Sequence, residues 1–241
     1  MHPPSPIIEF DNVSKSFGAK TALANLTLSI EPQQFVVLLG SNGAGKTTLL
    51  RLIATLARPT RGSIQVAGLD TVQHGEQVRQ QIGFASHETL LYEDMSVEKN
   101  LQFHARMHGL DDPADRIEHL LDIMDLTTQR LTPTRTLSRG MQQRLSIARA
   151  MLHNPQVLLL DEPLATLDTP TIETLSTLLH TLNDQGHTIL LTTNNSEHIL
   201  LMGTRAIALS KGRITHDELR DPNLTMNEGV YEIYAAFSGT F

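Results

Sequence analysis

Short apolar segments alternate along the chain with longer amphipathic segments in which apolar residues recur every three to four positions. The short runs favour buried strands, and the longer period favours helices. The predicted strands are residues 7–10, 26–30, 35–39, 63–66, 82–85, 157–161, 188–193 and 206–210. The predicted helices are residues 47–57, 97–108, 113–124 and 139–152, one that follows Pro170, and a short one at 231–237. This alternation is typical of an α/β fold with a parallel sheet and crossover helices.

Helical segments dominate the middle of the chain, from residue 87 to residue 151. We expect this block, 87–151, to be a helical subdomain inserted into a catalytic core formed by residues 7–86 and 152–214. Residues 215–241 are predicted to be a C-terminal tail. Residues 1–241 are therefore expected to form one domain, since the length suits a single α/β unit with one insertion.

The composition narrows the classes of function, because the 241 residues include no cysteine and carry a formal net charge of −7. Disulfides, thiolate catalysis and cysteine-ligated zinc or iron–sulfur clusters are excluded. The negative charge argues against a nucleic-acid partner, since such binding needs an excess of Lys and Arg. The apolar runs are shorter than the about 20 residues that cross a bilayer, and the first residues lack a secretory signal. We therefore expect a cytoplasmic protein that reaches a membrane only through a partner.

A phosphate-binding loop is the clearest motif. Residues 40–47 read GSNGAGKT and match G-x-x-x-x-G-K-[ST] in full, between a predicted strand and a predicted helix, a context that a chance match lacks. The glycines allow backbone N–H groups to surround a phosphate, and the helix N-terminus adds its positive dipole end. The predicted nucleotide ligands are Gly40, Ser41, Asn42, Gly43, Ala44, Gly45, Lys46, Thr47 and Thr48. Lys46 is expected to reach the β- and γ-phosphates, and Thr48 to bond an α-phosphate oxygen.

The predicted second half of the site is the strand 157–161, VLLLD, followed by Glu162. Strand alternation would orient its two adjacent carboxylates differently. Asp161 is expected to share a magnesium ion with Thr47, because Mg²⁺ prefers hard oxygen ligands. Glu162 is expected to be the catalytic general base that polarises the attacking water. Such a pair is usually only a strand end, but the phosphate loop upstream favours the catalytic interpretation.

Residues 137–144, LSRGMQQR, lie between these motifs at a predicted helix start, where Ser138 can cap the helix and Gly140 leaves the backbone accessible. With the motifs in this order, residues 7–214 resemble the ATP-binding subunit of ABC transporters. The resemblance implies a P-loop NTPase fold with a RecA-like mixed-sheet core, N-terminal antiparallel strands and an inserted helical subdomain. It also implies ATP and Mg²⁺, a membrane-spanning partner subunit, and a position on the inner face of the cell membrane.

The same resemblance assigns further site residues. Ser138, Gly140 and Gln142 belong to the family's signature motif, which binds the γ-phosphate of ATP held by a second copy in a head-to-tail dimer. The dimer is either a homodimer or a heterodimer with another ATPase chain. Asp168 matches the interface loop that follows. Phe17 matches the aromatic residue that stacks on adenine, and the alternative for Phe17 is a core residue at a strand end.

Two positions depart from the family's pattern. His87 stands where the family has a glutamine that contacts the magnesium or its water. By its position, His87 is assigned to the predicted magnesium site with Thr47 and Asp161. Histidine is a poorer magnesium ligand than an oxygen donor, so Glu88 is the candidate substitute through water. The alternative is that His87 is a solvated loop residue. Asn194 stands where the family has a catalytic histidine at the γ-phosphate, and asparagine donates a hydrogen bond without carrying charge. His198, one helical turn further on, is the alternative donor. The departures predict slowed hydrolysis.

Together the motifs predict an ATP-hydrolysing motor subunit of an ABC-type exporter. Residues 48–63, 82–109 and 137–163 are similar to the haem-exporter ATPase of cytochrome c maturation, and drug or lipid exporters have a similar build. One alternative is an ATP-dependent switch or regulatory subunit whose degenerate site hydrolyses little. Another is a soluble ABC protein of translation or DNA repair. That class usually carries two such domains or long coiled coils, which the pattern of this acidic chain does not predict.

Overall fold

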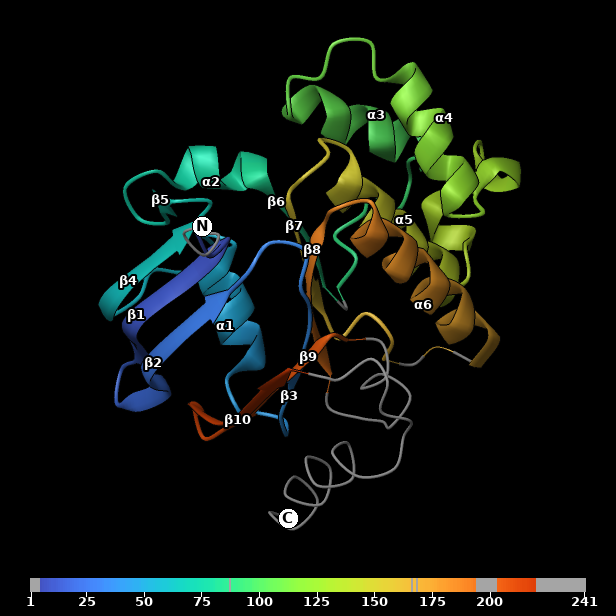
Figure 1. The fold of residues 1–241 in the computed structure, drawn as a ribbon. Coiled ribbons are helices and arrows are strands. Elements are labelled where there is room, and N and C mark those ends of the chain that lie inside the picture. The colour runs from blue at the N-terminus through green and yellow to red at the C-terminus, as the bar shows by residue number, and fades with distance from the viewer. Residues whose placement is uncertain (1–4, 87, 166, 168, 194–202, 220–241) are drawn as a thin grey trace.

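The structure is a computed structural model that describes residues 5–86, 88–165, 167, 169–193 and 203–219. Its strands form two sheets, and helices pack against them (Figure 1). The strands are β1 (Ile8–Phe17), β2 (Lys20–Ile30), β3 (Phe35–Leu39), β4 (Arg61–Val66), β5 (Leu69–Asp70), β6 (Ile82–Ser86), β7 (Val157–Asp161), β8 (Thr188–Thr193), β9 (Arg205–Ser210) and β10 (Arg213–Leu219). The helices are α1 (Lys46–Ile53), α2 (Gly75–Gln81), α3 (Val97–Met107), α4 (Ala114–Ile123), α5 (Arg139–Met151) and α6 (Thr169–Asp184), with short 3₁₀ helices at Thr127–Gln129 and Thr134–Thr136.

The larger sheet has the strand order β10-β9-β3-β8-β7-β6. Neighbours from β9 to β6 are parallel and β10 pairs antiparallel with β9, so the sheet is mixed. Every residue of β3, β7 and β8 is buried, as expected for central parallel strands that are covered on both faces. Full burial explains why these three segments are continuously apolar in the sequence. Their predicted bounds are confirmed.

Alternate side chains of the central strands face two separate cores. Phe35, Val37 and Leu39 of β3 lie in the core that contains α3, α4, α5 and α6. Val36 and Leu38 lie in the core formed with α1 and the smaller sheet. Figure 1 shows α1 next to β1 and β2, and the green and yellow helices grouped beyond the larger sheet. The loop at the C-terminal end of β3 therefore starts where both cores meet.

The smaller sheet is antiparallel, with the order β2-β1-β4-β5, which confirms the predicted N-terminal antiparallel strands. β1 and β2 are longer than predicted, because the prediction ended β1 at Phe10, where polar residues follow. In the sheet those polar side chains lie at the surface while the backbones continue to pair, as between Ser16 and Thr21. The resulting hairpin brings Phe17 and Lys20 to its tip.

The helical block matches the sequence pattern closely, and α3, α4 and α5 lie within one residue of the predicted bounds at each end. Ser96 and Ser138 cap α3 and α5, since the hydroxyl of each accepts a backbone N–H from the first turn. Of the helices that the structure describes, none is long and apolar enough to cross a membrane.

Other elements differ from the prediction. α1 ends at Ile53 rather than residue 57, because Thr55 has a φ of +60°, in the left-handed region. The sequence did not predict β5, α2 or β10. In α2 only Val78 is buried, and nearly every residue of β10 is exposed, so neither has an apolar period. β10 also crosses the predicted boundary between core and tail at residue 214. The predicted helix at 231–237 lies outside the described residues.

Candidate nucleotide-binding site

The loop between β3 and α1 turns tightly where the helix begins. Gly43 and Gly45 have φ angles of +83° and +112°, in the region that favours glycine. A Cβ on Gly45 would lie 2.7 Å from the carbonyl oxygen of Ala22, so the loop packs directly against β2. Because α1 starts at Lys46 with Gly45 as its N-cap, its first free N–H groups lie at this loop. The local geometry is that of an anion-binding turn.

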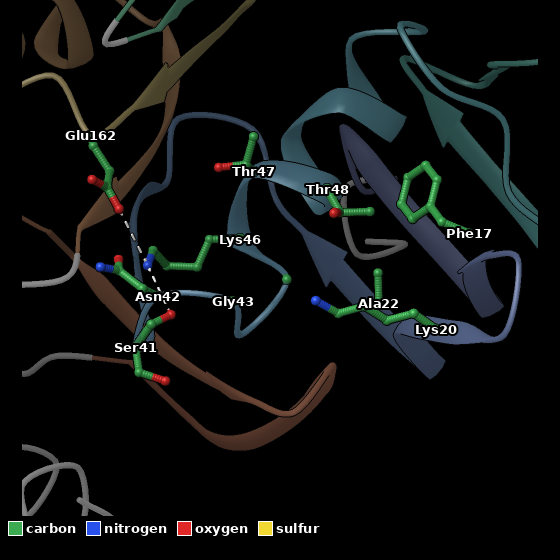
Figure 2. Close-up of a pocket in the computed structure, with 11 residues that line it drawn as sticks. Phe17, Lys20, Ala22, Ser41, Asn42, Gly43, Lys46, Thr47, Thr48 and Glu162 are labelled. Atoms are coloured by element: carbon green, nitrogen blue, oxygen red, sulfur yellow. Dashed lines mark hydrogen bonds and ion pairs between the residues drawn. The ribbon is translucent and has the colours of Figure 1, made fainter.

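The Lys46 ammonium is held at the loop by three contacts. Its side chain is only 4% exposed. Its Nζ donates hydrogen bonds to the carbonyl oxygens of Gly40 at 2.6 Å and Ser41 at 3.3 Å. Glu162 Oε1 lies 3.4 Å from the same atom, as Figure 2 shows. A buried ammonium with a single carboxylate partner can exchange that partner for a phosphate.

Asp161 ends β7 in a buried position and accepts two hydroxyl hydrogen bonds on its Oδ1. Thr47 Oγ1 donates from the start of α1 at 3.1 Å, and Thr192 Oγ1 donates from β8 at 2.7 Å. The sequence did not indicate Thr192. Its role could be found only from the pairing of β7 with β8, which places Thr192 opposite Asp161 in the register of the two strands.

Glu162 diverges from Asp161 as predicted, but for a different reason. Strand alternation was expected to separate the two carboxylates, whereas β7 ends at Asp161 and Glu162 has a φ of +51°. The Glu162 N–H donates to Thr192 Oγ1 at 3.0 Å, which supports this left-handed conformation. The turn directs the Glu162 carboxylate to Lys46 and leaves Asp161 with Thr47.

A cavity of about 290 Å³ extends along the loop (Figure 2). It is lined by Phe17, Lys20, Ala22, Ser41, Asn42, Gly43, Gly45, Lys46, Thr47, Thr48 and Glu162. Two predicted ligands do not line it. Gly40 contributes its carbonyl to Lys46, and Ala44 is buried in the core instead. The structure thus brings most of the predicted phosphate-loop residues to one cavity with the predicted general base.

Phe17 marks the end of the cavity at the β1–β2 hairpin. It is 56% exposed, so the alternative of a core residue is wrong. The Nζ of Lys15 lies 4.7 Å from the centroid of its ring, a cation–π contact. An exposed ring beside a phosphate loop can stack on a flat base. Lys20 and Ala22 also line this end, and the sequence did not indicate either, because only the hairpin places them there.

The predicted signature residues lie away from this cavity. The Ser138 hydroxyl accepts a backbone N–H at 3.2 Å and caps α5. A Cβ on Gly140 would come within 3.0 Å of Thr171, so glycine allows α5 to approach the start of α6. Gln142 Nε2 donates to the carbonyl oxygen of Thr134 at 3.0 Å. Ser138, Gly140 and Gln142 do not line the phosphate-loop cavity of their own chain.

A second cavity, of about 410 Å³, lies at the start of α5. It is lined by Glu88, Thr89, Arg139, Gln142, Gln143, Glu162, Ala165 and Leu167. Glu162 therefore lines both cavities, and it stands between the phosphate loop and the signature segment.

The sequence model of the family described as "ABC transporter" matches residues 23–165, more than half of the chain. This chain belongs to the ABC transporter family. Its relatives include the sulfate/thiosulfate import ATP-binding protein CysA of Mesorhizobium japonicum, which is 38% identical over 88% of this chain and 64% of that protein. They also include the Nod factor export ATP-binding protein I of Cupriavidus metallidurans, which is 35% identical over 86% of this chain and 69% of that protein. This chain spans less than two thirds of the length of the CysA protein.

A solved ABC cassette has the same fold. The dimeric post-hydrolysis structure of the ATP-binding cassette MJ0796, bound to ADP and phosphate, superposes with a TM-score of 0.80. The two chains are 28% identical, and the match covers 89% of this chain and 99% of that chain. The predicted α/β cassette fold is therefore confirmed.

Some of the residues predicted from the ABC resemblance lie outside the described part of the chain: His87, Asp168, Asn194 and the alternative His198. Their roles stay predictions. Glu88, the proposed substitute for His87, is exposed and lines the second cavity. Among the residues that the structure places, no three His, Cys, Asp or Glu side chains gather in a cluster that could hold a metal.

Proposed function

We propose that this chain is an ATP-hydrolysing motor subunit of an ABC transporter. The observation that carries the proposal is the contact between Lys46 and Glu162 at the phosphate loop, beside the hydrogen-bonded pair of Asp161 and Thr47. These four side chains bring together a phosphate-binding cation, a base and two oxygen ligands for a metal. Phosphoryl transfer to water needs these groups in one place.

The nucleotide lies along the cavity, with its base on Phe17 and its phosphates over the loop. The N–H groups at the start of α1 and the Lys46 ammonium offset the negative charge of the phosphates. Thr48, which lines the cavity, bonds an α-phosphate oxygen. This order follows from the exposed ring at one end of the cavity and the buried ammonium at the other.

The oxygen donors fit a magnesium ion. Asp161 Oδ1 and Thr47 Oγ1 already lie 3.1 Å apart, and both are hard ligands. One carboxylate and one hydroxyl suit an ion that takes its other ligands from phosphates and water. When bound, Mg²⁺ neutralises charge on the β- and γ-phosphates.

Glu162 is the general base, and the γ-phosphate frees its carboxylate from the contact with Lys46. A bound γ-phosphate attracts Lys46 and competes with Glu162 for its ammonium. Glu162 then orients a water molecule and accepts its proton while the water oxygen attacks the γ-phosphorus and the bond to the β–γ bridging oxygen breaks. The Lys46–Glu162 contact thus links base activation to the presence of a third phosphate.

Phosphate release by the purified chain tests this role of Glu162. Glu162→Gln is expected to keep ATP affinity and to lower turnover at least about 100-fold, because an amide cannot accept the proton. Glu76→Gln, on the exposed face of α2, is the matched control and should hydrolyse like wild type. Wild-type turnover by Glu162→Gln would overturn the assignment.

The second feature of the proposal is slow hydrolysis. Asn194 carries no charge, and loss of one such electrostatic contact elsewhere costs about 10²–10³ in rate. In the same assay, Asn194→His is therefore expected to turn over faster than wild type. Equal rates would contradict this part of the proposal. ATP-stabilised dimers that release no phosphate would favour the alternative of an ATP-dependent switch.

The working unit is two copies, or this chain with a different ATPase chain, attached to a membrane-spanning subunit on the inner face of the membrane. The support is that Ser138 and Gly140 lie away from the phosphate loop of their own chain, and that the MJ0796 cassette is dimeric. The relatives include both an import and an export protein. The predictions of export and of haem as cargo rest on the subgroup resemblance alone, so the proposal is the motor rather than its cargo.

A further inference from the structure

Lys20 is a second lysine of the nucleotide cavity and belongs to none of the motifs described above. It is the first residue of β2 and pairs with Phe17 across the hairpin turn. It lines the cavity with Phe17, Gly43 and Thr48. Figure 2 shows its side chain extending from beneath Phe17, past Ala22, toward the turn of the phosphate loop.

The three lysines at this site have different partners. The Lys46 ammonium binds two carbonyl oxygens and Glu162. The Lys15 ammonium lies over the Phe17 ring. The side chain of Lys20 makes no hydrogen bond or ion pair with any residue of the described ranges, and it is exposed. Its charge is therefore available to a ligand.

The charges around the cavity also favour an anion next to Lys20. Among the described lining residues, Glu162 is the single carboxylate, and it lies at Lys46. The Lys20 end thus has an ammonium without a facing carboxylate among the described lining residues. This end of the cavity lies between Phe17, on which the base is proposed to stack, and Thr48, which is proposed to bond the α-phosphate. In that placement the Lys20 end holds the ribose and the first phosphate.

We propose that Lys20 binds the α-phosphate of the nucleotide and raises the affinity for ATP and ADP alike. The inference rests on the proposed function, since it takes the base to lie on Phe17 and the last two phosphates at Lys46. An ammonium on the α-phosphate acts on every adenine nucleotide, whereas one on the γ-phosphate would act on ATP alone. Lys20 is a binding residue rather than a catalytic one.

Calorimetric titration of Mg-ATP and Mg-ADP into Lys20→Met and Lys20→Arg tests the proposal. Methionine keeps most of the length of the side chain but removes the charge, so both dissociation constants should rise by the same factor, about 5- to 10-fold. Arginine should retain most of the affinity. The difference between wild type and Lys20→Met should shrink as salt increases, because the lost contact is ionic. Lys99→Met, on the exposed face of α3, is the control and should bind like wild type.

Two results would overturn the inference. Unchanged affinities in Lys20→Met would show that Lys20 does not contact the nucleotide. A loss confined to ATP would place the ammonium at the γ-phosphate instead. If the wild-type protein bound neither nucleotide, the proposed function itself would fail. If the wild-type protein and Lys20→Met bound both nucleotides equally well, only the inference about Lys20 would fail.

Discussion

At the scale of single residues, the site combines side chains that the sequence indicates with side chains that only the fold assembles. Lys46, Thr47 and Asp161 could be predicted, because a local motif or a strand end fixes their surroundings. Thr192 and Lys20 could not, since their roles depend on which strands are neighbours and on how the β1–β2 hairpin closes. Thr192 contacts both acidic residues, for it donates to the Asp161 carboxylate and accepts from the Glu162 backbone N–H.

Thr192→Val therefore tests whether this unpredicted hydroxyl positions the site. The change keeps the shape but leaves buried Asp161 with one donor fewer and the Glu162 N–H without its acceptor. We expect a loss of about 1–3 kcal/mol in the free energy of unfolding and a lower turnover number. Thr192→Ser, which keeps the hydroxyl, should stay close to wild type in both. Denaturant unfolding and steady-state ATPase assays measure the two effects, and a valine variant that matches the serine variant would contradict the role.

At the scale of elements, a cluster of histidines joins α3 to the end of α5. The rings of His108 and His153 stack with centroids 4.0 Å apart. Burial, together with the charges of Arg149 and His108, lowers the pKa of His104 to about 4. The pKa of His153 also falls to about 4. Burial is the main cause and the charges of His108 and Arg116 add to it, while the hydrogen bond to the Ile82 carbonyl partly opposes the shift. The pKa of His108 falls through burial and through Arg149.

Acid should therefore weaken the packing of these helices. In the unfolded chain the histidines have a pKa of about 6.5, so below that pH they bind more protons than in the folded protein. The stability from the neutral rings is complete above about pH 6.5 and is lost as the pH falls toward about 4. The double variant His104→Gln/His153→Gln should lose less stability over this range than wild type or His119→Gln, a control on the exposed side of α4. Urea unfolding at several pH values measures this, and equal slopes in all three proteins would contradict it.

Predictability at this scale follows from burial. The segments that pack on both sides, such as β3, β7 and β8, and the helices with one apolar face, α3 to α5, were predicted nearly to the residue. β10 and α2 were not, because their side chains are mostly exposed and their position depends on backbone pairing or on one buried residue, Val78. The predicted end of α1 was wrong because Thr55, in the left-handed conformation, stops the helix within an apolar run.

At the scale of the whole molecule, the two groups of predicted nucleotide ligands lie in different places within one chain. The phosphate loop and the Ser138 segment belong to separate cavities, which share Glu162. In the proposed dimer, the signature segment of each chain serves the phosphate loop of the other. A head-to-tail pair would bring the two half-sites together twice.

Dimerisation should therefore depend on ATP and on the signature segment. In Glu162→Gln, which is expected to bind ATP without consuming it, Mg-ATP should convert monomers into dimers and Mg-ADP should not. Adding Gly140→Asp, which places a negative charge where the second copy meets the γ-phosphate, should keep the protein monomeric while it still binds ATP. Light scattering during size-exclusion chromatography measures both, and an ATP-independent dimer would contradict the account.

Titration of Mg-ATP into the purified chain is the measurement that tests the central claim most directly. The claim is that the loop from Gly40 to Thr47 binds the phosphates of a nucleotide through the Lys46 ammonium. The account predicts saturable heat with one site per chain, and a dissociation constant raised at least about tenfold in Lys46→Met, because the methionine lacks the charge. A folded wild-type chain that gives no binding heat, or a Lys46→Met chain that binds equally well, would contradict the account.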